Sequence, residues 1–246
     1  MRDTKYMAIP PGAILPGSLP KFKIYVLSPD GRYILWARSG NEVNRDRLVT
    51  LAETGQEEVY IDLDEEIKYE EYLENNLGII LENQGMPDQQ KAEVFSRVST
   101  NVVRDTFETS LGLGAMQPDP LRRTQALVNH SLMFIAESNS LRPLAKMIGH
   151  DYKTYEHATK VLWFTVAFLR SNPDILAQIV PDIESYHEVQ KKELLKQCGV
   201  GAMLHDIGKT FVSPEILNKN GPLNAVEWEI IKRHPLTSFA MLADTE

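Results

Sequence analysis

The sequence contains a single cysteine, Cys198, among its 246 residues. A lone thiol cannot form an internal disulfide, which fits the reducing cytoplasm, the location that we expect for this chain. No apolar run reaches the roughly 18 residues that a membrane-spanning helix needs. The N-terminus also lacks the basic segment and apolar stretch of a signal peptide. The sequence therefore predicts a cytoplasmic protein without a membrane span.

Positive charge is also scarce, because 26 Lys and Arg residues face 34 Asp and Glu residues and the net charge is −8. A surface that binds long nucleic acid usually carries a basic patch, and the sequence has no cluster of Lys or Arg that would form one. An acidic chain can still bind a small phosphate ester where metal ions supply local positive charge. The composition thus disfavours long nucleic acid as a partner and leaves small phosphate substrates open.

The N-terminal part of the chain mixes turn residues with short β-prone runs. Residues 1–20 are rich in Pro and Gly and predict an arm, and residues 21–63 predict a small β-β-α-β domain. Its strands are expected at 21–27, 32–38 and 59–63, and its helix at 44–54. The domain has no cluster of His, Cys or carboxylate residues that indicates chemistry. We expect it to sense a signal, to dock a protein partner or to form a homodimer.

The pattern becomes helical from residue 64 onward. We interpret residues 64–120 as a helical linker and residues 121–246 as a helical domain. Helices are expected at 64–83, 87–111, 121–137, 141–148, 154–170, 181–205 and 225–243. The predicted fold class is therefore a small α+β N-terminal domain followed by an all-α bundle.

The strongest local signal for chemistry is the pair His205-Asp206, which ends a predicted helix. Adjacent helical side chains point about 100° apart, so both reach one site only at a helix end or around a shared metal pair. An imidazole nitrogen and a carboxylate suit Mn, Fe, Zn or similar ions. A carboxylate can bridge two such ions, and a two-metal centre can clamp a phosphoryl group. Lys209, one turn later, can offer its charge to a phosphate oxygen.

The pair alone leaves a second interpretation open, in which His205 and Lys209 are favoured merely by the dipole at a helix C-terminus. A second pair, His150-Asp151, shows the difficulty. It lies in a predicted loop and lacks the Gly-Lys that follows His205-Asp206, so we assign it a structural or capping role. The wider sequence context has to decide between the two pairs.

Three segments resemble the HD-GYP family of the HD superfamily, whose members are metal-dependent phosphodiesterases that degrade cyclic di-GMP. Residues 151–161 resemble the Asp-x-x-Thr-Tyr-x-His stretch of the family's opening helix. Residues 205–223 begin with HDIGK and continue with the family's Pro, Ile-Leu, Lys, Gly and Leu positions. Residues 227–235 are similar to its Glu-Trp…His-Pro helix. The resemblance implies that the helical domain is an HD-domain bundle.

The resemblance also implies the metal ligands His157, His205, Asp206 and His234. One metal would use His157, His205, Asp206 and an aspartate later in the chain, and the other would use Asp206, His234 and two later histidines. Two divalent transition metals are implied, with Fe or Mn favoured and Zn, Ni or Mg as alternatives.

The resemblance also implies roles in the reaction for three residues, of which one is a metal ligand. Asp206 and Lys209 would be catalytic, and Lys209 and Lys219 would bind the substrate. Cyclic di-GMP would be opened to the linear dinucleotide or further to GMP, without a covalent enzyme nucleophile.

The sequence departs from the family pattern at several positions. Ser238 stands where the family usually has a glycine after His-Pro, and Lys153 stands where some members carry a glutamate for a third metal. The gap between His157 and His205 is long, which predicts a surface insertion. The sequence ends at Glu246, twelve residues past His234, before the paired histidines, the later aspartate and the Gly-Tyr-Pro loop. We therefore expect a fragment of a longer product, with an incomplete bundle, a weak second metal site and little or no activity of its own.

Two alternatives remain open at this point. The helical domain could be an HD phosphohydrolase of another nucleotide, although the match over 214–223 argues against that. It could also be a non-catalytic signalling module that binds cyclic di-GMP or a protein partner without turnover.

Overall fold

A computed structural model describes residues 5–111, 116–136, 154–180 and 182–243 of the chain. The chain divides into two units, Met1–Val98 and Ser99–Glu246, with the boundary inside helix α3 (Asp88–Ser110). None of the described helices is long and apolar enough to cross a membrane.

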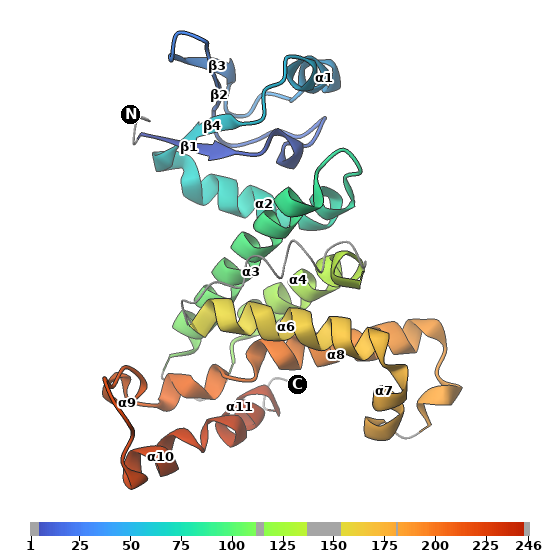
Figure 1. Ribbon diagram of the computed structural model, residues 1–246, viewed down its shortest axis with the longest axis vertical. Coiled ribbons are helices and arrows are strands. Elements are labelled where there is room, and N and C mark those ends of the chain that lie inside the picture. The colour runs from blue at the N-terminus through green and yellow to red at the C-terminus, as the bar shows by residue number, and fades with distance from the viewer. Residues whose placement is uncertain (1–4, 112–115, 137–153, 181, 244–246) are drawn as a thin grey trace. The chain divides into compact units, whose positions relative to one another are not determined.

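The first unit is built on a four-stranded antiparallel sheet with the strand order β1-β4-β2-β3 (Figure 1). The strands are β1 (Tyr6–Ile9), β2 (Ile24–Leu27), β3 (Tyr33–Ala37) and β4 (Val59–Asp62). The helices are α1 (Arg45–Glu53) and α2 (Glu66–Glu82). The β-β-α-β order predicted for residues 21–63 is present, with each element within a few residues of its expected position.

The predicted arm at residues 1–20 needs a correction, because it contains strand β1. Tyr6 pairs with Asp62 and Ile9 pairs with Val59, so this strand extends the sheet beside β4. The strand was missed because the Pro and Gly residues that follow it dominate the composition of the segment, while the strand itself has only four residues. Short edge strands are common and give a weak sequence signal.

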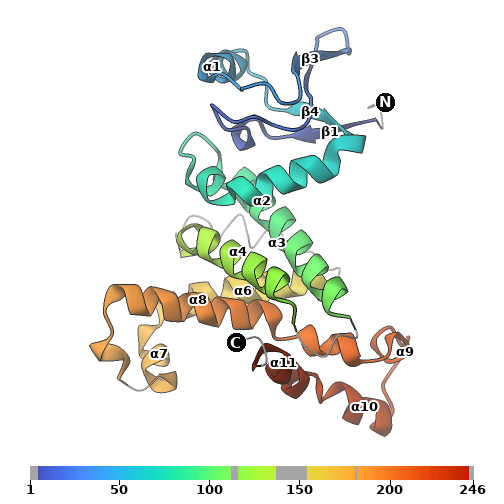
Figure 2. The same ribbon diagram turned by 180° about the vertical axis from the view of Figure 1, so that it is seen from behind.

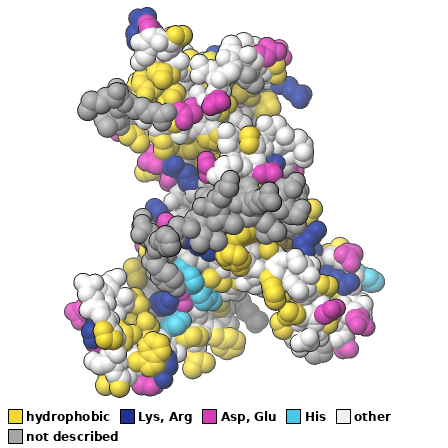
Figure 3. All heavy atoms as spheres, in the orientation of Figure 1, with side chains coloured by type: hydrophobic (Ala, Val, Ile, Leu, Met, Phe, Trp, Pro, Cys, Tyr) yellow, Lys and Arg dark blue, Asp and Glu magenta, His cyan; other side chains and the backbone are white. Residues whose placement is uncertain are grey.

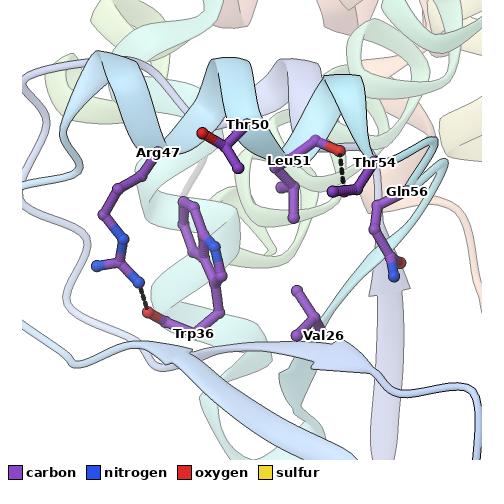
Figure 4. A pocket seen from close by; sticks show the side chains of 7 residues that line it. All are labelled: Val26, Trp36, Arg47, Thr50, Leu51, Thr54 and Gln56. Carbon is purple, nitrogen blue, oxygen red and sulfur yellow. Dashed lines mark hydrogen bonds between the residues drawn. The ribbon is translucent and has the colours of Figure 1, made fainter.

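A cavity of about 360 Å³ lies between α1 and the sheet of the first unit (Figure 4). Its lining residues are Val26, Trp36, Arg47, Thr50, Leu51, Thr54 and Gln56. The guanidinium of Arg47 lies 4.6 Å from the centre of the Trp36 ring and donates to the Trp36 carbonyl. The lining contains no His, Cys or carboxylate side chain, so this cavity offers no metal ligands of those types.

The second unit is helical, and α6 and α8 lie side by side with α4 against both (Figures 1 and 2). Its helices are α4 (Pro118–Ala136), α6 (Thr154–Ser171), α7 (Pro173–Ile179), α8 (Glu188–Leu204), α9 (Pro214–Leu217), α10 (Ala225–Ile231) and α11 (His234–Ala243). Gly199 permits the close approach of α8 to α4 and α6, because a Cβ added at Gly199 would lie 2.9 Å from Val128 Cγ1 and 3.1 Å from Leu162 Cδ1. Burial of apolar side chains between these helices is the main stabilising contribution.

Two predicted helices of this unit differ from the structure. The helix expected at 181–205 begins only at Glu188, after a 3-10 turn at Ile183–Ser185. The helix expected at 225–243 is two helices, because Pro235 has no N–H for the carbonyl of Ile231 and its ring clashes with a continuous helix there. The expected helix at 141–148 and the pair His150-Asp151 lie outside the described residues.

Candidate metal centre

The predicted site lies where α8 ends. His205 keeps helical backbone angles (φ −54°, ψ −29°), and at Asp206 the chain turns (φ −100°, ψ 3°) into a 3-10 helix at Ile207–Phe211. This change of direction lets two adjacent side chains face one point, as expected for a helix end. Asp206 is almost fully buried, with 2% of its surface exposed.

Three imidazoles from three different elements converge on this carboxylate. Nε2 of His205 lies 3.3 Å and Nε2 of His157 lies 3.8 Å from Oδ2 of Asp206. Nε2 of His234 lies 3.1 Å from the other oxygen, Oδ1. His157 stands in the first turn of α6, and His234 begins α11. In Figure 3 some of the histidine side chains lie next to one another on the face of the second unit, and another lies apart at the right.

Two of these rings are oriented by the backbone. Nδ1 of His205 lies 2.8 Å from the carbonyl oxygen of Ala202, and Nδ1 of His234 lies 2.6 Å from that of Ile231. A carbonyl only accepts hydrogen bonds, so each Nδ1 carries the proton and donates it. In the neutral ring Nε2 then keeps its lone pair, which is the arrangement found in metal-binding histidines.

The electrostatics of the cluster favour the metal-binding form of Asp206 and of His157, whereas at His205 they favour the protonated ring. Burial by itself raises the pKa of Asp206, but hydrogen bonds from His205 and Lys209 outweigh it and hold this pKa well below its ordinary value. Burial lowers the pKa of His157, against the attraction of Asp206. The hydrogen bond with Asp206 raises the pKa of His205. Asp206 is therefore an anion at neutral pH, and His157 is neutral.

Lys209 adds the positive charge that balances the buried carboxylate. Its Nζ lies 2.7 Å from Oδ2 of Asp206, three residues earlier in the chain. The sequence predicted that this ammonium would face a phosphate oxygen, and in the structure it is bound to Asp206. Its predicted roles in catalysis and substrate binding stay predictions.

Lys219, the other predicted substrate-binding residue, forms an ion pair with Glu227 at 2.5 Å. Glu227 also accepts a hydrogen bond from the backbone N–H of Asn224, which caps α10. The pair thus connects the loop after α9 to the start of α10. Substrate binding by Lys219 stays a prediction as well.

The sequence did not predict the contact between the 205–208 segment and α11, the helix that carries His234. Gly208 lies so close to α11 that an added Cβ would be 2.2 Å from the carbonyl oxygen of His234. The hydroxyl of Ser238 lies within hydrogen-bonding distance of three backbone groups, two of them in the 205–208 segment. The sequence signal for this contact was Ser238 itself, which stands where the family usually has a glycine. That departure from the family pattern does not reveal which groups the serine contacts.

The donor set fits a divalent transition metal. The ligand atoms of His157, His205 and Asp206 lie within 4.8 Å of one another, and imidazole with carboxylate suits Mn, Fe, Zn and Ni. His234 lies on the Oδ1 side, so the two oxygens of Asp206 face different histidines. A carboxylate placed in this way can bridge two ions. The four residues predicted as metal ligands are thus brought together, although no metal is part of the structure.

Comparisons with known proteins agree with this picture. The chain is 31% identical over 114 residues to the cyclic di-GMP phosphodiesterase PA4108 of Pseudomonas aeruginosa, a match that covers 46% of this chain and 24% of that protein. The chain therefore matches about a quarter of the length of this relative. The solved structure of Bd1817, an HDGYP protein from Bdellovibrio bacteriovorus, has a TM-score of 0.53 and 20% identity, and the match covers 98% of this chain and 72% of that one. No protein-family model matches the chain.

The resemblance to HD-GYP proteins that the motifs predicted is confirmed by these comparisons. The solved structure supports a shared fold, and the curated relative supports a likeness in sequence to a cyclic di-GMP phosphodiesterase.

Proposed function

We propose that the second unit is the metal-binding part of a phosphodiesterase that hydrolyses cyclic di-GMP in bacterial signalling. The observation that carries this proposal is the convergence of three imidazole Nε2 atoms on the two oxygens of the buried Asp206. The likeness to PA4108 supports the substrate class. Two divalent ions, with Fe or Mn favoured, are the cofactors that we expect.

The chain's own residues define what the site can do. A bound pair of divalent ions supplies an activated water and stabilises negative charge on a phosphoryl group. Asp206 offers one oxygen on each side, and the backbone carbonyls of Ala202 and Ile231 fix the two imidazoles next to it. The ammonium of Lys209 lies beside the same carboxylate, where it can donate to a phosphate oxygen of the substrate.

The decisive experiment compares metal content and turnover in the full-length protein. We expect bound Fe or Mn and hydrolysis of cyclic di-GMP, but not of nucleoside triphosphates. The variant H205A/D206A should lose both metal and hydrolysis. The matched control is H130A, because His130 is an exposed histidine of α4.

Each alternative outcome has a distinct meaning. Hydrolysis of triphosphates alone would assign the site to another nucleotide, and binding of cyclic di-GMP without turnover would make it a non-catalytic module. A folded protein without bound metal would refute the metal centre. The role of the first unit or of residues 64–120 in a homodimer or in binding a protein partner stays a separate prediction.

A further inference from the structure

We propose that Ser238 is a positioning residue of the metal centre, which holds His234 against the His205-Asp206 segment. The inference rests on the proposed metal site and names a residue that acts on one of its ligands. Ser238 follows His234 by one turn of α11 and is buried, with 4% of its surface exposed.

The hydroxyl of Ser238 connects two elements that carry metal ligands. Its Oγ can donate its one proton to the carbonyl oxygen of His205 at 2.7 Å, or share it with that of His234 at 2.9 Å. The backbone N–H of Gly208 donates to the same Oγ at 2.8 Å. One side chain thus contacts the peptide units of two ligands and of the residue two positions after Asp206.

A bond from a helical serine to the carbonyl four residues earlier is common and needs no functional explanation. Ser131 on α4 shows that ordinary case, because it is buried and its Oγ donates to Leu127 within its own helix. Ser238 differs in the contacts to His205 and Gly208, which lie on another element. Those two contacts carry the inference.

The approach of the two backbones is as close as glycine allows. An added Cβ at Gly208 would be 2.7 Å from the backbone nitrogen of Ser238 and 2.2 Å from the carbonyl oxygen of His234. The start of α11 is therefore fixed on the 3-10 helix, and this places Nε2 of His234 3.1 Å from Asp206.

The effect of Ser238 should be confined to one side of the carboxylate. His157 and His205 stand on α6 and at the end of α8, and both face Oδ2 of Asp206. His234 alone among these histidines comes from α11. Loss of the Ser238 hydroxyl should therefore misplace His234 and leave the Oδ2 side largely intact.

A double-mutant cycle on metal affinity tests this. In the full-length protein, Zn²⁺ affinity would be measured by competition with a chromophoric chelator for wild type, S238A, H234A and S238A/H234A. We expect S238A to weaken binding about 10- to 100-fold, the usual effect of losing a group that orients a ligand. In the H234A background the same change should have less than about a twofold effect. S131A is the matched control and should leave the affinity unchanged.

A second measurement needs no metal. Long-range ¹H–¹⁵N spectra of the metal-free protein report the tautomer and environment of each imidazole. S238A should shift the His234 signals and leave those of His157 in place, and S238T, which keeps a hydroxyl, should restore them. Circular dichroism melts confirm that each variant is folded.

The outcomes separate this inference from the proposed function. If wild type binds no metal while S238A shifts the His234 signals, the metal centre is wrong and the positioning role stands. If S238A weakens Zn²⁺ binding equally with and without His234, or leaves both the affinity and the His234 signals unchanged, the positioning role is refuted.

Discussion

Replacing Gly208 by alanine should damage both the stability of the second unit and its metal site. The new Cβ would lie 2.2 Å from the carbonyl oxygen of His234, whereas carbon–oxygen contacts normally lie at roughly 3.3 Å or more. The two backbones must therefore separate by about 1 Å. Such overpacking costs about 1–3 kcal/mol, and the lost hydrogen bond from Gly208 to Ser238 adds about 1 kcal/mol.

The expected loss is therefore about 2–4 kcal/mol, which corresponds to a Tm decrease of roughly 5–15 °C for a unit of this size. Differential scanning calorimetry of the metal-free protein measures it directly. Separation of the backbones would also carry His234 away from Asp206, because Nε2 now lies only 3.1 Å from Oδ1. Zn²⁺ affinity should therefore fall together with Tm.

Two other glycines of the same unit provide matched controls. A Cβ at Gly201 on α8 would meet nothing within 4 Å, so G201A should raise stability by up to about 1 kcal/mol through helix propensity. A Cβ at Gly199 would meet the ends of the Val128 and Leu162 side chains, which can move, so G199A should destabilise less than G208A. A G208A protein with wild-type Tm and wild-type Zn²⁺ affinity would refute the close backbone contact.

Three further predictions concern individual groups. Burial raises the pKa of the Cys198 thiol. Iodoacetamide should therefore alkylate Cys198 at pH 8 more slowly than it alkylates free cysteine. An equal rate would contradict the burial of this side chain. The pair Lys219–Glu227 is partly exposed, and ion pairs of this kind stabilise a protein little. K219A should therefore change Tm by little. An increased KM for cyclic di-GMP would identify substrate binding by Lys219, whereas an unchanged KM would exclude it. The hydrogen bond with Asp206 raises the pKa of His205. A proton on Nε2 of His205 competes with a metal ion, so the affinity for Zn²⁺ should fall as the pH decreases from 8 to 6. An affinity that is independent of pH would mean that His205 is not a ligand.

The elements with strong local signals could be predicted from the sequence. The β-prone runs at 21–27 and 32–38 predicted two strands, and the structure contains them as the antiparallel pair β2 and β3. Strand β1 has only four residues, and its pairing with β4 joins residues 50 to 56 positions apart, which no local pattern reveals. The division at Pro235 could have been foreseen, since proline inside a helix removes a hydrogen bond, but the apolar periodicity on both sides of it favoured one helix.

The sequence predicted which residues form the candidate site, but it did not predict the contacts that hold them in place. Spacing alone could not bring His157, His205 and His234 together, because nothing local relates three separate helices. The family motifs did so, and the structure places all three around Asp206. The contact between Gly208 and α11 could not be predicted, because it depends on how closely two backbones approach rather than on side-chain chemistry.

The position of Lys209 explains how the fold accommodates the buried carboxylate of Asp206. An unpaired charge with the 2% exposure of Asp206 would be strongly destabilising. Lys209 compensates it at 2.7 Å on Oδ2, the oxygen that also faces His157 and His205. Oδ1 faces His234, which depends on Gly208 and Ser238 for its place. A divalent ion on the Oδ2 side must therefore compete with the ammonium of Lys209, whereas an ion on the Oδ1 side meets the imidazole of His234. The two sides of this carboxylate should therefore differ in their affinity for a metal.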